Sequence, residues 1–274
     1  MKNHTTFRIG GNAKIVIFPQ TIDELVSLIK YLRNEKVIVV GNGSNLLAPD
    51  EGLDCYVIKT TKLNSAWADG NKITAQCGAT LGKIASVALA NSLAGFEFAS
   101  GIPGTLGGGV LMNAGAYGGE LSQVVISTTY CDKNGNVFSI NNEEHEFSYR
   151  HSFFSDKDYI ILSSEIELKS GDMNEISNKM KELNKRRSDK QPLNFPSAGS
   201  AFKRPKGYFA AKLIEDCGLK GVSVGGACVS EKHCGFIVNT GDATANDVKE
   251  LIKLCQSEVY NKFRVKIEPE IKIL

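Results

Sequence analysis

The side chains best suited to chemistry on an anion gather in one short polar segment of the C-terminal half. The segment SAGSAFKRP at 197–205 places Ser200 among small residues, with Lys203 and Arg204 directly after it. A hydroxyl beside two cations suits a phosphate or a carboxylate ligand. A surface turn is the alternative, because serine and glycine are common turn residues. The segment has no GxSxG pattern, so the nucleophile elbow of a hydrolase is not indicated.

An arginine and a glutamate stand in two other unusual settings. Arg150 lies among aromatic residues in YRHSFF at 149–154, where its fork of donors could stack on a ring and hold a carboxylate. Glu270 lies between isoleucines in IEPEIKIL at 267–274, a segment whose apolar residues indicate packing. The alternatives are an arginine at an exposed strand end and a glutamate on an exposed strand face.

Two glycine-rich segments are candidates for a ligand cradle. GNGSN at 41–45 directly follows four apolar, β-branched residues, and small residues there leave main-chain N–H groups open to a phosphate. The segment 101–120 holds eight glycines, interleaved with Ile102, Leu106 and Val110. A flexible linker would lack such apolar residues. The second segment is therefore interpreted as a packed ligand cradle, whereas the first alone is equally compatible with an ordinary loop.

Several classes of function are disfavoured by what the chain does not contain. There is no HExxH, no GxxxxGK[ST] and no GxGxxG entering a helix, and the four histidines lack metal-ligand spacing. Seven cysteines with scattered spacing and no CxxC favour reduced thiols over zinc or disulfides, and no metal site is expected. A net charge of +2 disfavours nucleic acid and membrane surfaces as partners. With no membrane span or signal peptide in view, we expect a cytoplasmic protein. The residues do not give the oligomeric state, for which a monomer is our expectation.

Hydrophobic periodicity places these residues on small α/β units rather than in a helix bundle or a β-sandwich. The pattern predicts helices at 21–32, 81–91, 172–190 and 207–217 and one that begins near residue 244. Strands are expected at 14–19, 37–40, 56–59, 72–79, 124–130, 137–140, 159–168, 235–238 and 265–274, the last interrupted by Pro269, and a loop is expected at 191–206. The pattern of the chain changes near Gly171, which predicts one domain at 1–171 and another at 172–274.

In combination, the motifs resemble those of the UDP-N-acetylenolpyruvoylglucosamine reductases, flavoenzymes of bacterial peptidoglycan precursor synthesis. The resemblance covers nearly the whole chain. It rests on HTTFRIGG (4–11), GNGSNLL (41–47), SGIPGTLGG (100–108), MNAGAYGGE (112–120), YRHSFF (149–154), PSAGSAFKRP (196–205), GLKG (218–221), HCGFIVN (233–239) and IEPEI (267–271).

The resemblance implies an α+β fold with FAD as cofactor and NADPH as reductant. Residues 1–171 would form an FAD-binding domain of the vanillyl-alcohol oxidase (PCMH) type, made of two α/β subdomains. Residues 172–274 would form a C-terminal α/β substrate-binding domain. The residues expected to hold FAD are Gly41, Asn42, Gly43, Ser44, Asn45, Leu46, Gly101, Ile102, Pro103, Gly104, Thr105, Gly107, Gly108, Asn113, Ala114, Gly115 and Ala116.

The resemblance also implies a reaction and a set of catalytic residues. UDP-N-acetylglucosamine enolpyruvate would be reduced to UDP-N-acetylmuramate, with hydride from reduced FAD and a proton from Ser200. Arg150 and Glu270 match the family residues that stabilise the enolate, which requires the glutamate to carry or share a proton. Residues expected to contact the substrate are Lys190, Lys203, Arg204 and His233. The chain continues directly into GYFAAKLIEDCGLKG at 207–221, as in the class that lacks a long substrate-covering tyrosine loop.

Two other readings stay open on the residues themselves. One is an FAD oxidase or dehydrogenase of the same fold with a different substrate. The other is a flavin-binding or nucleotide-sugar-binding protein without turnover. Matches at Arg150, Ser200 and Glu270 together argue against both.

Overall fold

A computed structural model describes all residues from 1 to 274, and the chain divides into two compact units. Unit 1 consists of Met1–Lys14, Gly43–Asp54 and Arg187–Leu274, and unit 2 of Ile15–Asn42 and Cys55–Arg186. The units are interleaved along the chain, whereas the two predicted domains follow one another. The prediction that 1–171 binds FAD and 172–274 binds substrate concerns ligands and stays a prediction.

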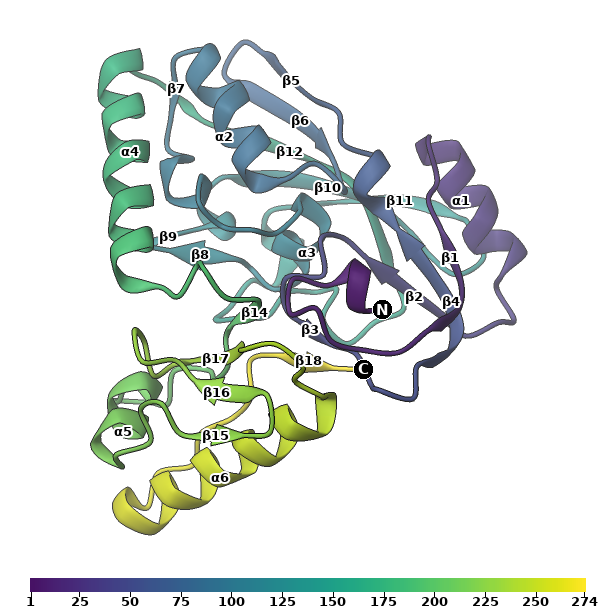
Figure 1. Cartoon of the computed structure of the whole chain (residues 1–274). Coiled ribbons are helices and arrows are strands. Elements are labelled where there is room, and N and C mark those ends of the chain that lie inside the picture. Colours follow the sequence, from purple (N-terminus) through teal and green to yellow (C-terminus); the bar gives the residue numbers. More distant parts are fainter. The chain divides into compact units, whose positions relative to one another are not determined.

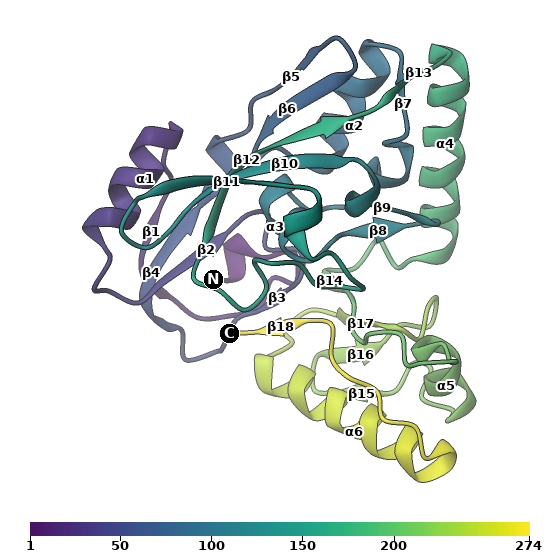
Figure 2. The same ribbon diagram turned by 180° about the vertical axis from the view of Figure 1, so that it is seen from behind.

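The centre of unit 2 is a five-stranded antiparallel sheet. Its strand order is β11-β10-β12-β6-β5, and helix α2 (Leu81–Ala90) packs against β5 and β6 (Figure 1). The strands are β5 (Ala66–Asp69), β6 (Lys72–Gln76), β10 (Val125–Cys131), β11 (Val137–Asn141) and β12 (Ile160–Glu167). Figure 2 shows β10, β12 and β6 as neighbours from the opposite side. Leu81, Ile84, Ala85 and Ala88 form the buried face of α2, which confirms the predicted amphipathic helix.

A smaller sheet positions the first glycine-rich loop. It has the order β1-β4-β2, from β1 (Ala13–Ile17), β2 (Val37–Val40) and β4 (Leu53–Lys59). Strands β2 and β4 are parallel, with Val40 opposite Lys59, so both end at the same edge of the sheet. Helix α1 (Ile22–Tyr31) connects β1 and β2 and begins after Thr21, whose hydroxyl accepts the Glu24 N–H.

Shorter elements complete unit 2. Three of them lie in the second glycine-rich segment at 101–120, and one of these three is a six-residue helix that the sequence pattern did not predict. The shorter elements are α3 (Leu106–Leu111), β7 (Leu93–Ala94), β8 (Gly115–Ala116), β9 (Gly119–Glu120) and β13 (Lys169–Ser170), and the longer helix α4 (Met173–Lys190) continues into unit 1.

Unit 1 is a four-stranded sheet with the order β14-β17-β16-β15, covered by the long helix α6. Its strands are β14 (Ser197–Ser200), β15 (Ser223–Val224), β16 (Ala227–Val229) and β17 (Phe236–Asn239). Helix α6 (Ala245–Phe263) begins at a capping box formed by Thr244 and Asp247, and α5 (Ala210–Asp216) packs on it. The C-terminal strand β18 (Lys272–Ile273) pairs in parallel with β3 (Leu46–Leu47).

The predicted helices are confirmed, but two predictions of local structure are wrong. The segment expected to be a loop at 191–206 contains strand β14, because the small polar residues SAGS pair with the apolar strand β17. The expected strand at 265–274 is regular only at Lys272–Ile273, with one isolated bridge between Phe202 and Pro269. Tertiary pairing overrides local propensity in both places.

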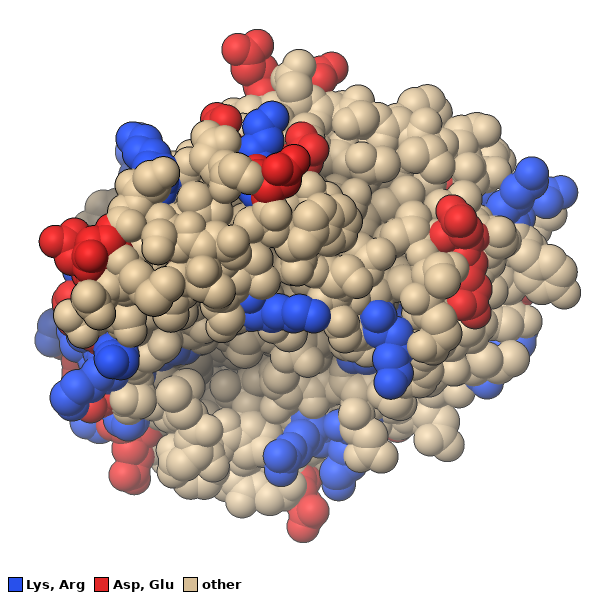
Figure 3. All heavy atoms as spheres, turned by 90° about the horizontal axis from the view of Figure 1, so that it is seen from above, with Lys and Arg blue, Asp and Glu red and all other residues tan.

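Several chemical features of the surface and core bear on function. The seven cysteines are free, and burial raises the pKa of Cys77 and of Cys255 to about 12, which keeps both thiols protonated. No group of three or more His, Cys, Asp or Glu side chains is arranged to hold a metal ion. None of the helices combines the length and apolarity that a membrane crossing requires. On the face drawn in Figure 3, basic and acidic side chains are scattered among uncharged ones.

Candidate active site

The two glycine-rich segments meet in unit 2, at the ends of strands β2 and β4. Asn42 Nδ2 donates to the Pro103 carbonyl over 2.6 Å, and the Cα of Gly41 faces the side chain of Thr105. A Cβ at Gly41 would overlap Thr105 Oγ1, so this position requires glycine for close approach. The structure thus brings Gly41, Asn42, Pro103 and Thr105 together, as one cradle requires.

A buried lysine that sequence reasoning missed holds this cradle. Lys59, the last residue of β4, is 5% exposed, and its Nζ donates to the Gly41 carbonyl over 2.7 Å. Burial lowers the pKa of Lys59. The sequence offers only a weak signal for it, a lysine at the end of the strand expected at 56–59.

The rest of the second segment leaves an open surface for a ligand. The main-chain N–H groups of Leu106 and Gly107 donate to the carbonyls of Ala79 and Cys77, respectively. These hydrogen bonds fix the start of α3 on the segment that contains residues 77–79. At Gly108, by contrast, a Cβ would meet no atom nearer than Thr105 Oγ1 at 3.8 Å. Open space beside a glycine next to Thr105 fits a cofactor whose diphosphate approaches the main chain closely. The residues present therefore fit FAD.

Asn113, one of the residues predicted to hold FAD, is buried and hydrogen-bonded within the chain. The side chain is 1% exposed, Nδ2 donates to the Ser148 carbonyl over 3.1 Å, and Oδ1 accepts from the Ser122 N–H over 2.9 Å. Its amide therefore joins two protein segments. Farther along, Tyr117 and Gly118, both with positive φ, form the turn between β8 and β9, and the guanidinium of Arg186 lies 5.0 Å from the Tyr117 ring centre.

Arg150 occupies a tight turn between Ser148 and His151, which form an antiparallel bridge with main-chain hydrogen bonds of 3.1 and 3.2 Å. Its φ is +57°, a left-handed conformation that is uncommon for residues other than glycine. The guanidinium carbon lies 5.0 Å from the centre of the exposed Tyr149 ring. The stacking suggested by the aromatic context is therefore present.

Ser200 and Glu270 lie in unit 1 on adjacent segments. Ser200 ends β14 opposite Phe236, and the Glu270 N–H donates to the carbonyl of Ala201 over 2.9 Å. Asn45 joins the same group, because its Nδ2 donates to the Glu270 carbonyl over 3.1 Å and its carbonyl accepts from Lys272. Residues from GNGSN, SAGSAF and IEPEI thus share one main-chain network.

The predicted substrate cations make separate local contacts within unit 1. Lys203 pairs with Glu268 over 3.6 Å at an exposed position, where an ion pair contributes little, and Arg204 lies 4.7 Å from the Phe209 ring centre. Lys190 ends α4, and its charge adds to burial in lowering the pKa of His233. Nδ1 of His233 accepts from the Gly235 N–H over 3.1 Å, so the neutral ring carries its proton on Nε2.

One buried acceptor beside Lys190 has no donor within the chain. Oε1 of Gln191 is buried and makes no hydrogen bond. Such an atom is costly to bury unless a ligand or water serves it. It was not singled out from the sequence, where a glutamine before proline carries no signal.

Two family profiles match this chain. Residues 13–141 match the profile of the FAD binding domain, and residues 191–274 match that of the C-terminal domain of UDP-N-acetylenolpyruvoylglucosamine reductase. These matches confirm the predicted fold class at the level of an FAD-binding domain and a C-terminal domain, and FAD is the cofactor.

Relatives match along the whole chain. A UDP-N-acetylenolpyruvoylglucosamine reductase of Caldanaerobacter subterraneus subsp. tengcongensis is 54% identical, covering 100% of this chain and 91% of the relative. The one from Clostridioides difficile is 50% identical with the same coverage. The crystal structure of the MurB reductase from Thermus caldophilus is 34% identical, with a TM-score of 0.85 over 99% of this chain and 96% of that one. The chain belongs to the UDP-N-acetylenolpyruvoylglucosamine reductase family of enzymes.

Proposed function

We propose that this enzyme reduces UDP-N-acetylglucosamine enolpyruvate to UDP-N-acetylmuramate, with NADPH as the reductant, in peptidoglycan precursor synthesis. The observation that carries the proposal is the hydrogen-bond network that joins Asn45, Glu270 and Ala201, the residue after Ser200. This network lies in a chain that is 54% identical to a UDP-N-acetylenolpyruvoylglucosamine reductase. The proposal includes a cytoplasmic location and a monomeric state. It also assigns the enzyme to the class that lacks the long substrate-covering tyrosine loop.

The FAD cradle is assigned to the glycine-rich segments. Bound FAD supplies the hydride chemistry, which no side chain can perform. Gly41 and Asn42, with Pro103–Thr105 and Gly108, leave the main chain open to the diphosphate, while Lys59 holds the Gly41 carbonyl. The other predicted cofactor residues keep their assignment on the family resemblance.

Each catalytic side chain has a separate role in this proposal. Ser200 donates a proton to the vinyl carbon that becomes basic, and a hydroxyl can do so only when the acceptor is an enolate. Arg150 offers a positive charge to the substrate carboxylate, and its main chain is held in a left-handed turn. Glu270, with a proton, donates a hydrogen bond to the same developing charge.

The substrate cations are assigned to the nucleotide diphosphate and its surroundings. Lys203, Arg204 and His233 keep this role, and Lys190 is assigned to the surroundings of the reacting groups on the family resemblance. The lowered pKa of His233 keeps its ring neutral at pH 7, with Nε2–H as a donor for phosphate oxygen. The unsatisfied Oε1 of Gln191 beside Lys190 supports a ligand with a hydrogen-bond donor there.

The test separates the two half-reactions under anaerobic conditions. Bound flavin is reduced with one equivalent of NADPH, and UDP-N-acetylglucosamine enolpyruvate is then added while the flavin absorbance is followed. Rapid return of the oxidised spectrum supports the proposal. Reduction without reoxidation would favour a flavoenzyme with another substrate, and a flavin spectrum that neither NADPH nor substrate changes would favour a binding protein.

A further inference from the structure

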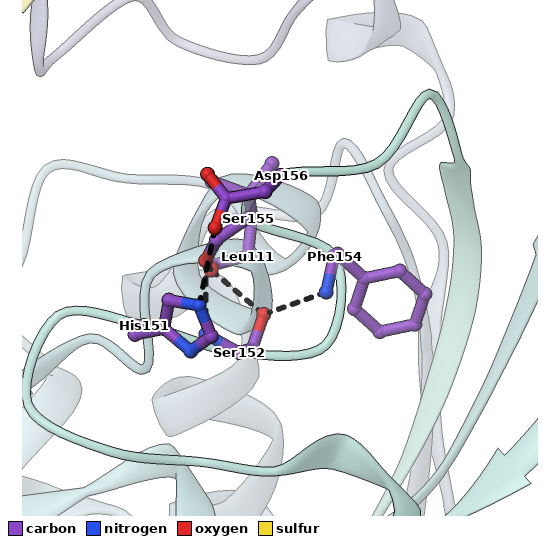
Figure 4. A network of polar contacts seen from close by, with 6 residues as sticks. All are labelled: Leu111, His151, Ser152, Phe154, Ser155 and Asp156. Atoms are coloured by element: carbon purple, nitrogen blue, oxygen red, sulfur yellow. Dashed lines mark hydrogen bonds and ion pairs between the residues drawn. The ribbon is translucent and has the colours of Figure 1, made fainter.

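Two serine hydroxyls tie the segment after Arg150 to the end of helix α3. Ser152 Oγ donates to the Leu111 carbonyl over 2.7 Å, and Ser155 Oγ donates to the same oxygen over 3.0 Å (Figure 4). Leu111 is the last residue of α3, where carbonyls lack helical partners. The two serines therefore supply the hydrogen bonds that this helix end needs.

The serine pair is internally ordered. Ser152 is fully buried, its Oγ also accepts from the Phe154 N–H over 3.3 Å, and its own N–H donates to Ser155 Oγ over 2.9 Å. Figure 4 shows Ser152 and Ser155 directed at Leu111 from the same loop. Nε2 of His151 lies 3.4 Å from Oδ2 of Asp156 across this loop. Both side chains are accessible to solvent, so this pair contributes little to the stability of the loop.

A second link holds the other side of the turn. The buried amide of Asn113 donates to the carbonyl of Ser148, the residue that opens the turn. Both ends of the Arg150 turn are thus fixed to positions 111 and 113, which lie two residues apart in the glycine-rich segment.

Such links are required by the conformation of Arg150. A non-glycine residue at φ +57° is strained, and strain persists only where the surrounding structure over-determines it. We propose that Ser152, assisted by Ser155, is a positioning residue that fixes the Arg150 turn to the FAD cradle, and so aims the guanidinium at its anionic ligand. This inference rests on the proposed function of Arg150 and adds residues that the family motifs did not assign.

The first test measures both half-reactions in Ser152→Ala with FAD at saturation. Flavin reduction by NADPH should be unchanged, while reoxidation by the enolpyruvate substrate should slow about 10- to 100-fold, because a displaced guanidinium binds the carboxylate poorly. Ser155→Ala should give a smaller loss, since Ser152 still serves Leu111. Ser86→Ala, which removes a hydroxyl bonded only to Gly82 within α2, is the matched control and should leave both steps intact.

The second test asks whether the serine acts through Arg150. In the Arg150→Ala background, Ser152→Ala should slow reoxidation no further, because there is no guanidinium left to position. An equal additional loss in that background would show general disruption of the loop and overturn the inference. Unchanged reoxidation in both serine variants would also overturn it while leaving the proposed function intact.

The same cycle identifies failure of the proposed function itself. If Arg150→Ala reoxidises at the wild-type rate, or if the wild type does not reoxidise with this substrate, the role of Arg150 is wrong and the positioning role falls with it. Should Ser152→Ala fail to fold, Ser155→Ala in the two backgrounds gives the same comparison with a milder change.

Discussion

The main-chain N–H of Glu270 donates a 2.9 Å hydrogen bond to the carbonyl of Ala201, which places the glutamate beside the residue that follows Ser200. The Glu270 carbonyl in turn accepts from Asn45 Nδ2 over 3.1 Å. The Glu270 peptide is therefore fixed on both sides, by segments far away in the sequence. Rigid placement of this kind is what a proton donor and an anion stabiliser require.

Replacement of Ser200 by alanine should separate the two half-reactions. Flavin reduction by NADPH should keep its rate, whereas reoxidation by the enolpyruvate substrate should fall about 100- to 10,000-fold, the usual contribution of a general acid. Anaerobic stopped-flow absorbance of the flavin measures both rates. Ser197→Ala, three residues earlier in the same strand, is the control and should behave like the wild type. Equal slowing of both steps by Ser200→Ala would remove the proton-donor role.

Replacement of Lys59 by methionine should weaken FAD binding. Methionine retains most of the buried volume but cannot donate to the Gly41 carbonyl, which frees the loop that faces the cofactor. A hydrogen bond from a charged donor contributes about 1.5 to 3 kcal/mol, so FAD affinity should fall roughly 10- to 100-fold. Titration of apoprotein by flavin fluorescence measures this, with the exposed Lys62→Met as control. Equal affinity in both variants would mean that Lys59 does not support the cradle.

Replacement of Gly41 by alanine should be destabilising, and Thr105→Ala should relieve the effect. The added Cβ would overlap Thr105 Oγ1, whereas truncation of Thr105 removes both atoms beyond its Cβ. Overpacking of this kind costs about 1–3 kcal/mol, and most of that loss should vanish in the double variant. Urea unfolding of the four proteins at one fixed FAD concentration gives the coupling. Additive losses would show that the two loops do not press together here.

The sequence patterns were sufficient for the elements with strong periodicity. Helix α2 and strand β2 follow directly from apolar spacing, and α6 from its spacing and the Thr244 cap. Strand β14 could not be predicted in this way, because SAGS has no apolar alternation and becomes a strand only by pairing with β17. The opposite holds for the C-terminal segment IEPEI. Its apolar and polar residues alternate as in a strand, but it is irregular and has only one isolated bridge, between Phe202 and Pro269.

In the candidate site, too, some residues could be predicted from the sequence and others could not. Glycine-rich segments and the arginine, serine and glutamate were visible as unusual residue types in unusual settings. Lys59 and Ser152 were not visible in this way, because each donates a hydrogen bond to a carbonyl oxygen that only the folded chain brings near. The acceptor is the Gly41 carbonyl for Lys59 and the Leu111 carbonyl for Ser152. Residues whose role is to hold main chain in place carry little signal in a single sequence.

A buried histidine gives unit 2 a stability that depends on pH. His145 is fully buried; its Nδ1 lies 2.6 Å from the Asn141 carbonyl and its Nε2 2.7 Å from Thr128 Oγ1. Because a carbonyl only accepts, Nδ1 carries the proton and Nε2 accepts from Thr128, whose oxygen can then accept from Ser164 at 2.8 Å. The network therefore contains the neutral ring.

Protonation of His145 should oppose folding. Burial lowers its pKa below the ordinary value of 6.5, so the unfolded chain binds more protons between the folded-state pKa and 6.5. Stability should consequently fall as the pH drops below about 6.5, and the loss is complete below the folded-state pKa. His233, whose pKa is also lowered by burial, contributes in the same direction.

His145→Gln should reduce this sensitivity while lowering stability itself. Without a titrating ring, the variant should lose less free energy of unfolding than the wild type when the pH is lowered from about 7.5 to about 5.5. At the higher pH it should be less stable by about 1–3 kcal/mol, since buried hydrogen-bonding groups lose their partners. Urea unfolding at both pH values measures the two effects, and His151→Gln, whose ring is solvent-exposed, controls for the substitution. A wild-type pH dependence retained in full by His145→Gln would assign it to other groups, His233 first among them.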